Sequence, residues 1–578
     1  MSLFDELKRR KEFRVAIGYV IAAWVIAQVA ELVADVFLAP PWGMQMIVTM
    51  LIEGLPNSLL LSWAVDLTAE GITRTENGEV EGRLIVGSKP VLALVAGLFV
   101  ATAVIFYVTW PRGDRSIAVL PFEDISPGGD QAYFGNGIAD ELRLELQGLD
   151  GLRVAGRTSS IASAQEDGKT IGEILNVDSI VEGSIRKEGS SVRITVQLTN
   201  AADGFTIWSE SYDRGLANIF EVQEEIATSV AGALGVRLGV GTINAFRGAG
   251  TRNVEAYEAY LQGQSLNVTR EERLRLAERA VELDPNYAVA WSFLAHRTLA
   301  TSWDSSPKQG SEIIDRAYSH ALHGVELNPE SAVAQKNLAM VRSAQLDWIG
   351  AEEGFRRAIE LLADRPIVST YASVLLRNGR TAEAQKQYGI AVSLEPLGGR
   401  PVPMSWHASL AQGRFDEAKE ISNWRPAPTR IENNLDIALN ERNPEELKAA
   451  IQAMLKTNVA AIALYAPVLA EFDSAERILT ILRDVHLDEN LQWPRKHHDI
   501  SMFAAYFGDP QFALDVKGQE VRNSVVRLAT LWYPVMSEVR QLPEFKELVT
   551  DLNLVEYWRA YGWADACRPL GENDFTCI

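Results

Sequence analysis

The sequence predicts a multidomain protein with three N-terminal transmembrane helices, a mixed α/β domain and an all-α solenoid of helical repeats. The stretch 90–110 carries no charged side chain and has the ~20 residues that a helix needs to cross a bilayer. Short apolar runs typical of strands begin at residue 116. Beyond residue 254, apolar residues recur at a fixed 33-residue spacing, which indicates stacked helix pairs.

The predicted membrane part has three spans, at 15–37, 46–65 and 90–110. Backbone groups inside lipid must bond internally, so each span is expected to be a helix. The tail 1–14 carries Lys8, Arg9, Arg10, Lys11 and Arg14, whereas the turn 38–45 has no basic residue. Basic loops favour the cytoplasmic side. The sequence therefore predicts a bacterial inner-membrane protein with a cytoplasmic N-terminus and periplasmic soluble domains.

The first two predicted spans contain polar residues, which are Gln28, Glu31, Asp35, Glu53 and Asn57. Charges within a bilayer are costly and usually face protein or water. These residues either form an intramembrane polar site or lie near the headgroups, and both interpretations stay open. A two-span alternative makes the segment around Glu53 re-entrant. Alanine and glycine stripes in the first and third spans would let helices approach closely, which allows a homo-oligomer.

The segment 116–240 is expected to form the mixed α/β domain. Ser116–Phe122 is a continuous apolar run typical of a buried strand, and Ile138, Leu142 and Leu146 mark one face of a helix at 136–148. Alternation of apolar and polar residues predicts a hairpin of strands 179–186 and 191–200. A further strand at 205–212 and an amphipathic helix at 219–238 complete the domain.

Several blocks of this segment have a family resemblance. They are SIAVLPFEDIS, YFGNGIADEL, LRVAGRTSS, VEGSIRKEGSSVRITVQLTNAADGFTIWSESYDR and IFEVQEEIA. They resemble the TolB amino-terminal-like (FlgO-like) domains of bacterial envelope proteins. In such chains the domain often precedes tetratricopeptide repeats, sometimes behind an adenylate cyclase domain and a membrane span. The resemblance implies no catalytic residues, and this chain has no cyclase domain ahead of the spans.

The segment 254–566 is expected to hold the helical repeats. Ala351, Phe355 and Ala358 recur one period later as Ala384, Tyr388 and Ala391. These stretches resemble tetratricopeptide repeats, although the step from Pro285 to Pro329 is 44 residues and indicates an insertion. Stacked helix pairs of this kind form a groove. The sequence predicts protein partners bound in that groove and degenerate repeats beyond Pro426.

The net charge and the two cysteines bear on the ligands and on the compartment of the protein. The formal net charge of −21 argues against binding to nucleic acid, which requires basic patches. The only two cysteines, Cys567 and Cys577, lie in the tail 567–578. In an oxidising periplasm they are expected to form a disulfide that holds the tail beside the aromatic residues of 557–563. In the two-span alternative both thiols stay free.

Candidate chemistry is sparse. Gly135-Asn-Gly137 could present N–H groups to an anion, but a Gly-rich turn before the 136–148 helix explains it better. The pairs His320 with His323 and His497 with His498 lack the further ligands of a metal site. No catalytic, cofactor-binding or metal residue is predicted, no cofactor is expected, and the chain is predicted not to be an enzyme.

The function predicted from the sequence is that of a membrane-anchored periplasmic scaffold or sensory protein that acts through its repeats. The first alternative is a membrane subunit of a transport or signalling complex that uses the polar intramembrane residues. The second alternative is an enzyme with an unrecognised site in the α/β domain.

Overall fold

The computed structural model describes residues 19–20, 23–24, 66–68, 71–73, 115–149, 151–234, 250–265, 268–302, 307–395, 404–457, 462–491, 493, 495–523, 525–571 and 574–578. The chain divides into two compact units, Met1–Asp114 and Arg115–Ile578. In the first unit, β1 (Asp66–Thr68) pairs antiparallel with β2 (Gly71–Thr73). Apart from two short helical stretches at 19–20 and 23–24, the predicted spans lie outside the described residues.

In the part of the chain that it describes, the structure does not bear out the prediction of three transmembrane helices, nor the inner-membrane location and membrane-integral character that followed from it. Among the described residues, none of the helices is both long and apolar enough to cross a bilayer. The longest of them, α13 (Pro307–Leu327), has 21 residues but carries Glu312, Asp315 and Arg316. A charge at mid-bilayer costs about 2.5–3.5 kcal/mol. The apolar face of α13 instead packs inside the protein, where Ala317 and Ala321 are fully buried.

The second unit begins with a six-stranded mixed sheet of order β5-β3-β6-β7-β8, in which β4 also pairs with β6. The strands are β3 (Arg115–Val119), β4 (Glu123–Asp124), β5 (Leu152–Val154), β6 (Ser179–Glu188), β7 (Ser191–Asn200) and β8 (Thr206–Gly215). β3 is parallel to β5 and β6, and β6, β7 and β8 form antiparallel pairs. The hairpin predicted at 179–200 is present, as β6 and β7.

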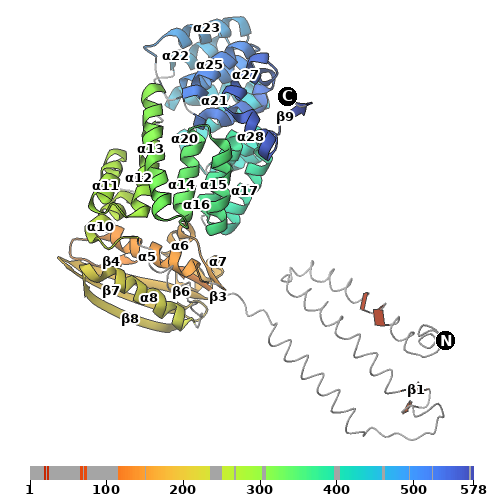
Figure 1. Cartoon of the computed structure of the whole chain (residues 1–578). Helices are drawn as coiled ribbons and strands as arrows, with labels where there is room; N and C mark the ends of the chain where they lie inside the picture. Colours follow the sequence, from red (N-terminus) through yellow and green to blue (C-terminus); the bar gives the residue numbers. More distant parts are fainter. Residues whose placement is uncertain are drawn as a thin grey trace. The chain divides into compact units, whose positions relative to one another are not determined.

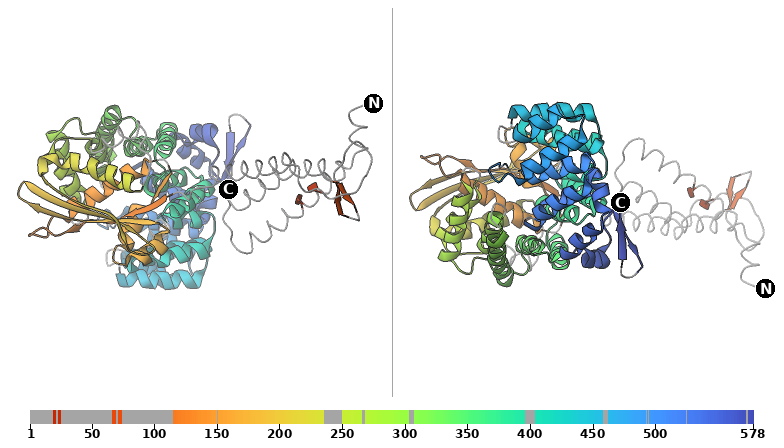
Figure 2. Two further views of the ribbon diagram at one scale, coloured as in Figure 1. Left: turned by 90° about the horizontal axis from the view of Figure 1, so that it is seen from below. Right: turned by 90° about the horizontal axis from the view of Figure 1, so that it is seen from above.

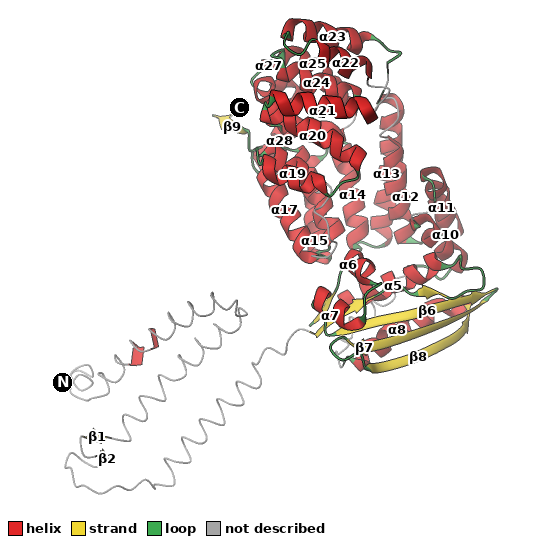
Figure 3. Cartoon of the chain, turned by 180° about the vertical axis from the view of Figure 1, so that it is seen from behind, coloured by secondary structure: helices red, strands yellow, loops and turns green. Residues whose placement is uncertain are grey.

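Helices cover both faces of this sheet (Figure 3). On one face, α5 (Ala132–Gln147) and α8 (Ile219–Ala233) pack their apolar residues against inward residues of β3, β6 and β7. On the other face, α7 (Gly168–Leu175) packs Ile171 against Ala118 and Leu120. A further short helix, α6 (Arg157–Ser163), was not predicted, because its residues RTSSIAS lack an apolar period. Ile117, Ala118 and Val119 of β3 are all apolar, because both faces of the strand are buried there.

The position of Gly135-Asn-Gly137 corrects the expectation of a turn before a helix. Both glycines lie inside α5, and both are buried. A Cβ on Gly135 would stand 2.8 Å from the carbonyl oxygen of Phe122, and one on Gly137 would stand 2.5 Å from the side chain of Leu261. The glycines therefore let α5 approach the sheet and the first repeat closely, and their backbone N–H groups belong to the helix.

Antiparallel helix pairs follow the sheet (Figure 1). They are α10 (Val254–Gln264), α11 (Arg270–Leu283), α12 (Ala288–Thr301), α13, α14 (Ala332–Ala344), α15 (Trp348–Leu361), α16 (Arg365–Arg377), α17 (Thr381–Leu394), α18 (Ser405–Ala411), α19 (Phe415–Asn423), α20 (Ala427–Glu441), α21 (Pro444–Thr457), α22 (Ile462–Ala470), α23 (Ala475–Leu487), α24 (Lys496–Tyr506) and α25 (Pro510–Asn523).

Packing between these helices explains the 33-residue recurrence. Phe355 of α15 and Tyr388 of α17 are both buried, as are the alanines on either side of each in the recurring pattern. Small residues at these positions let the paired helices approach closely. The 44-residue step between Pro285 and Pro329 reflects the length of α13, which has 21 residues where α11 and α15 have 14 each.

The first repeat shares one hydrophobic core with the α/β domain. Tyr257 of α10 meets Phe134 of α5 and Phe220 of α8 edge-on, with ring centroids 6.1 and 5.3 Å apart. Its hydroxyl also accepts a hydrogen bond of 2.8 Å from Gln223. Lys187 of β6 forms an ion pair with Glu258 of α10. These contacts fix the first repeat against the sheet domain.

The C-terminal segment folds back onto earlier helices (Figure 2). It consists of η4 (Val525–Trp532), η5 (Pro534–Met536), α26 (Ser537–Arg540), α27 (Pro543–Asp551), α28 (Leu554–Tyr561), β9 (Cys567–Leu570) and β10 (Asp574–Cys577). Three indole N–H groups attach it: Trp348 donates to the carbonyl of Leu552, Trp532 to that of Arg377, and Trp558 to that of Asn378, all within 2.8 Å. The segment therefore covers part of α15, α16 and the turn before α17.

Candidate anion-binding pocket

A pocket of about 260 Å³ opens among the first helices of three successive pairs, α10, α12 and α14. Its walls are Tyr260, Gly263 and Gln264 of α10, Arg273 of α11, Val289, Phe293, His296 and Arg297 of α12, and Val333, Lys336 and Asn337 of α14. Gln264 and Arg297 are 33 residues apart in the sequence, so the repeat geometry brings them to neighbouring positions. The pocket is thus formed by the stacking of the repeats.

The charge of this pocket is opposite to that of the chain. Arg273, Arg297 and Lys336 line it together with His296, and none of the lining residues is acidic. The whole chain has a net charge of −21. Like charges placed together repel one another, so this arrangement costs stability unless an anion occupies the pocket.

Several polar atoms of the pocket lack a protein partner. Arg273 donates through Nη2 to the carbonyl of Ser265, 3.0 Å away, but its Nε has no acceptor, and neither has Nε of Arg297. Asn337 is 3 % exposed and donates to the carbonyl of Ser292 at 2.8 Å, whereas its Oδ1 is unpaired. Lys336 forms no hydrogen bond or ion pair with the part of the chain that the structure describes. Buried polar groups are normally paired, so these groups are open to a ligand.

The environment of the pocket disfavours positive charge. Burial, with the nearby Arg297 and Lys336 adding to its effect, lowers the pKa of His296 to about 3. Burial also lowers the pKa of Arg297, with Arg273 and Arg270 adding to the effect. The neutral His296 ring lies 2.9 Å from Nη2 of Arg297 and accepts its hydrogen bond. A bound anion would reverse this balance, because an opposite charge stabilises the cationic forms.

An aromatic wall adjoins the cationic groups. Tyr260 meets Phe293 and Tyr287 edge-on, at centroid distances of 5.6 and 5.4 Å. The guanidinium of Arg297 lies over the ring of Phe293, 5.3 Å from its centroid. The pocket therefore offers a flat apolar surface beside donors for an anion, which suits a ligand with both a ring and an acidic group.

The predicted site residues lie elsewhere. Gln28, Glu31, Asp35, Glu53 and Asn57 are outside the described residues. His320 and His323 both contact the ring of Trp291, and His498 hydrogen-bonds to the buried Asp436. Within the described ranges, no three His, Cys, Asp or Glu side chains are grouped so as to hold a metal ion.

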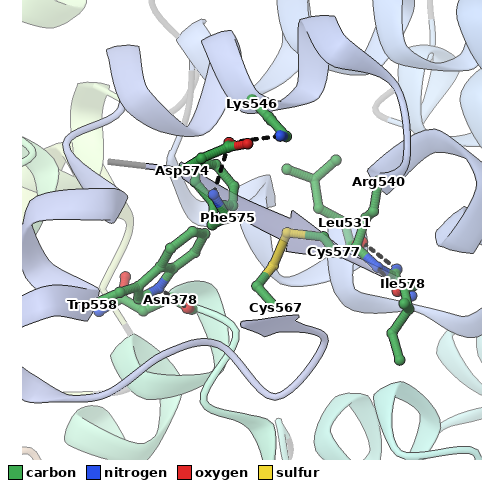
Figure 4. The surroundings of a disulfide bond; sticks show 10 residues. All are labelled: Asn378, Leu531, Arg540, Lys546, Trp558, Cys567, Asp574, Phe575, Cys577 and Ile578. Carbon is green, nitrogen blue, oxygen red and sulfur yellow. Dashed lines mark hydrogen bonds and ion pairs between the residues drawn. A yellow bond between two sulfur atoms is a disulfide. The ribbon is translucent and has the colours of Figure 1, made fainter. Parts of the chain in front are cut away.

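Cys567 and Cys577 are joined by a disulfide across the β9–β10 hairpin, with Cα atoms 4.0 Å apart (Figure 4). Beside it, the ring of Phe575 contacts those of Trp558 and Trp563. Arg540 donates to the carbonyl of Ile578 at 2.8 Å. The bond therefore closes the hairpin that holds Phe575 against the aromatic residues of the C-terminal segment.

Sequence reasoning missed the pocket residues. Basic and amide side chains on the first helices of successive repeats could have indicated them, since these helices lie next to one another in a stack. Their convergence depended on the length of α13, which places Lys336 and Asn337 of α14 beside α12. The sequence shows this length as an insertion without showing where the inserted residues go.

Comparison with known proteins gives limited information. No family model matches the chain. It is 35% identical over 189 residues to "Putative adenylate cyclase 3" of Rhizobium meliloti (strain 1021), a match that covers 31% of this chain and 32% of that protein. The chain thus matches about a third of the length of this relative. A dodecamer of a PelC variant from Paraburkholderia phytofirmans matches 21% of this chain and 89% of its own, at 17% identity and a TM-score of 0.16, which supports no argument about fold.

The similarity to a protein named as an adenylate cyclase corrects two predictions. The chain was predicted not to be an enzyme, and it was predicted to act as a scaffold through protein partners in the repeat groove. The relative carries the name of an enzyme rather than that of a scaffold. The groove prediction also overlooked the C-terminal segment, which covers several repeats with the chain's own residues.

Proposed function

We propose that the chain binds a phosphate-bearing nucleotide in the basic pocket of α10, α12 and α14, as part of a protein of the adenylate cyclase kind. The observation that carries the proposal is the pocket itself. Three cationic side chains converge there, two of them arginines with an unpaired Nε, and none of the residues that line the pocket is acidic. Arginine and lysine are the usual ligands of phosphate groups.

The named relative supports the choice of ligand class. An adenylate cyclase acts on an adenine nucleotide, which combines a flat ring with a phosphate chain. The pocket combines the aromatic Phe293 and Tyr260 with Arg273, Arg297 and Lys336. Its volume of about 260 Å³ lies just below the ~300–1,000 Å³ range of pockets that enclose drug-sized ligands. It is therefore sized for part of a nucleotide or for a small one.

The domain assignments belong to the same proposal. We assign the sheet domain to the TolB amino-terminal-like type and the helix pairs to the tetratricopeptide type, on the sequence blocks quoted above. The pocket then uses the first helices of the first three repeats. The contacts of α10 with α5 and α8 would pass a change at the pocket to the sheet domain.

Calorimetric titration of the purified full chain with ATP, cyclic AMP and pyrophosphate tests the proposal. The double variant Arg297→Met/Lys336→Met should weaken binding by about 100- to 10,000-fold, since it removes two hydrogen bonds to charged groups that contribute roughly 1.5–3 kcal/mol each. Arg275→Met is the matched control, because Arg275 is exposed on α11 and pairs only with the neighbouring Glu272. Absence of binding by the parent chain, or equal binding by the double variant, would refute the proposal.

A further inference from the structure

Lys336 differs from the other cations of the pocket in having an amine that can act as a nucleophile. It lies half-buried on α14, within the pocket, and makes no hydrogen bond or ion pair in the described part of the chain. The charged and titratable groups around it are His296 and Arg297 of α12 and Asp364, the residue that caps the start of α16. Its amine is therefore both accessible from the pocket and free to react.

We propose that Lys336 is an acylation site and that its acyl donor is an acyl phosphate held in the pocket by Arg297 and Arg273. The inference rests on the proposed function in one respect, since it uses the same cations to hold a phosphate group. A donor bound in this way presents its acyl carbon beside the amine. Such positioning turns a reaction between two molecules into a local one and raises its rate.

The reaction balances without any further reactant. The lone pair of the Lys336 nitrogen attacks the acyl carbon and forms a C–N bond. The C–O bond to phosphorus-bound oxygen then breaks, and inorganic phosphate leaves with that electron pair. The proton released by nitrogen passes to the phosphate or to water. Arg297 and Arg273 stabilise the leaving phosphate, whose charge grows as the bond breaks.

Before the donor binds, the surroundings keep part of the amine neutral, and the reaction proceeds from that neutral fraction. Burial lowers the pKa of Lys336, Asp364 opposes this effect, and Arg297 adds to it. Only the neutral amine is a nucleophile, so the rate at Lys336 should rise with pH and level off at a lower pH than for an ordinary lysine. The acylated side chain carries no charge, and acylation would therefore weaken the binding of anions in the pocket.

Acetyl phosphate is the probe. The purified full chain is incubated with it, and acetylation of each lysine is followed over time by mass spectrometry of peptides. Lys169 is the internal control. Its side chain is 71% exposed on α7, and its amine lies 4.0 Å from the carboxylate of Glu173. Acetylation at Lys336 should be several-fold faster than at Lys169, because the pocket holds the acyl phosphate beside the amine and burial keeps more of that amine neutral.

Two comparisons test whether the pocket positions the acyl donor or whether the Lys336 amine is simply more reactive. Arg297→Gln should slow acetylation at Lys336 several-fold and leave Lys169 unchanged. Acetic anhydride, which has no phosphate, should reduce the preference for Lys336. Equal rates at the two lysines would overturn the inference, and so would a preference that survives both comparisons. Nucleotide binding without preferential acetylation removes this inference alone, whereas preferential acetylation without nucleotide binding removes the proposed function alone.

Discussion

Two clusters of buried polar groups, one in the first repeats and one in the later repeats, differ in how far the chain itself pairs their atoms. In α10–α14, here called the open repeats, Arg273, Arg297 and Asn337 retain unpaired atoms around a pocket. In α15–α28, here called the closed repeats, Glu352 is 1 % exposed but accepts hydrogen bonds from Tyr371, Tyr557 and Arg356 at 2.6–2.9 Å.

The difference follows from where the C-terminal segment packs. Tyr557 lies on α28 and reaches Glu352 on α15, more than two hundred residues earlier in the chain. Asp436 of α20 is paired in the same manner by Arg495 and His498. Where the chain supplies its own partners, buried charge becomes part of the structure. At the pocket of the open repeats it does not, and the unpaired groups there are open to a ligand.

The largest expected effect of a substitution at constant pH is in the closed repeats. Glu352→Ala should lower the free energy of unfolding by about 3–5 kcal/mol, because it leaves Tyr371 and Tyr557 buried without their acceptor and removes the carboxylate that lies 3.7 Å from Arg380. Denaturant titration of the full chain measures the change. Glu353→Ala is the matched control, since the adjacent Glu353 is exposed. A loss of similar size in both variants would mean that Glu352 has no special role.

The second effect concerns the disulfide of the closed repeats. Replacing both cysteines in Cys567→Ser/Cys577→Ser should cost about 2.7 kcal/mol by the chain-entropy estimate for a loop of this length. Thermal unfolding of the variant, and of the parent with and without reductant, gives the measurement. Because the chain has no other cysteine, reductant should leave the variant unchanged. A parent that unfolds alike in both conditions would contradict the expectation.

The third effect concerns the junction between the open repeats and the sheet domain. Burial raises the pKa of Glu141 to about 8, although Tyr257 and Gln223 oppose it, and burial together with Glu141 and Glu224 raises that of Glu145 to about 9. Above pH ~4.3, the ordinary pKa of a glutamate, the unfolded state has released these two protons, whereas the folded state still holds them. The contribution of these two groups to the free energy of unfolding is therefore full below pH ~4.3 and is lost as the pH rises toward 8–9.

Denaturant titrations between pH 5 and pH 8 measure this loss, which should be at most about 1.4 kcal/mol per pH unit for each group. The double variant Glu141→Gln/Glu145→Gln keeps the neutral form at every pH, so its stability should fall less over this range. Glu173→Gln, on the exposed side of α7, is the control and should retain the slope of the parent. An unchanged slope in the double variant would contradict the expectation.

The smallest effect has the opposite sign and lies in the open repeats. Lys336→Met removes one of several mutually repelling charges and keeps the apolar stem, so the free energy of unfolding should stay equal or rise by up to ~1 kcal/mol. Nucleotide binding should weaken at the same time. Lys169→Met should change neither quantity. Destabilisation by more than about 1 kcal/mol would show that Lys336 is a structural residue like Glu352.

The sequence by itself determined the local elements of this protein. Alternation in Val192, Ile194, Val196 and Leu198 was enough to predict β7, because a period of two leaves one face buried. The 33-residue recurrence likewise predicted the pairing of α15 with α16 and α17, since Phe355, Ala384, Tyr388 and Ala391 all belong to one core.

The tertiary structure decided the rest, because it depends on contacts between residues far apart in the chain. The sequence could not show that Trp558 would bond to Asn378, or that Tyr557 would satisfy Glu352. Nor could it show that Arg273, Arg297 and Lys336 would meet. These three residues meet only when three helices stack at a spacing set by α13. A local pattern of hydrophobic residues does not show which polar groups will be left without partners.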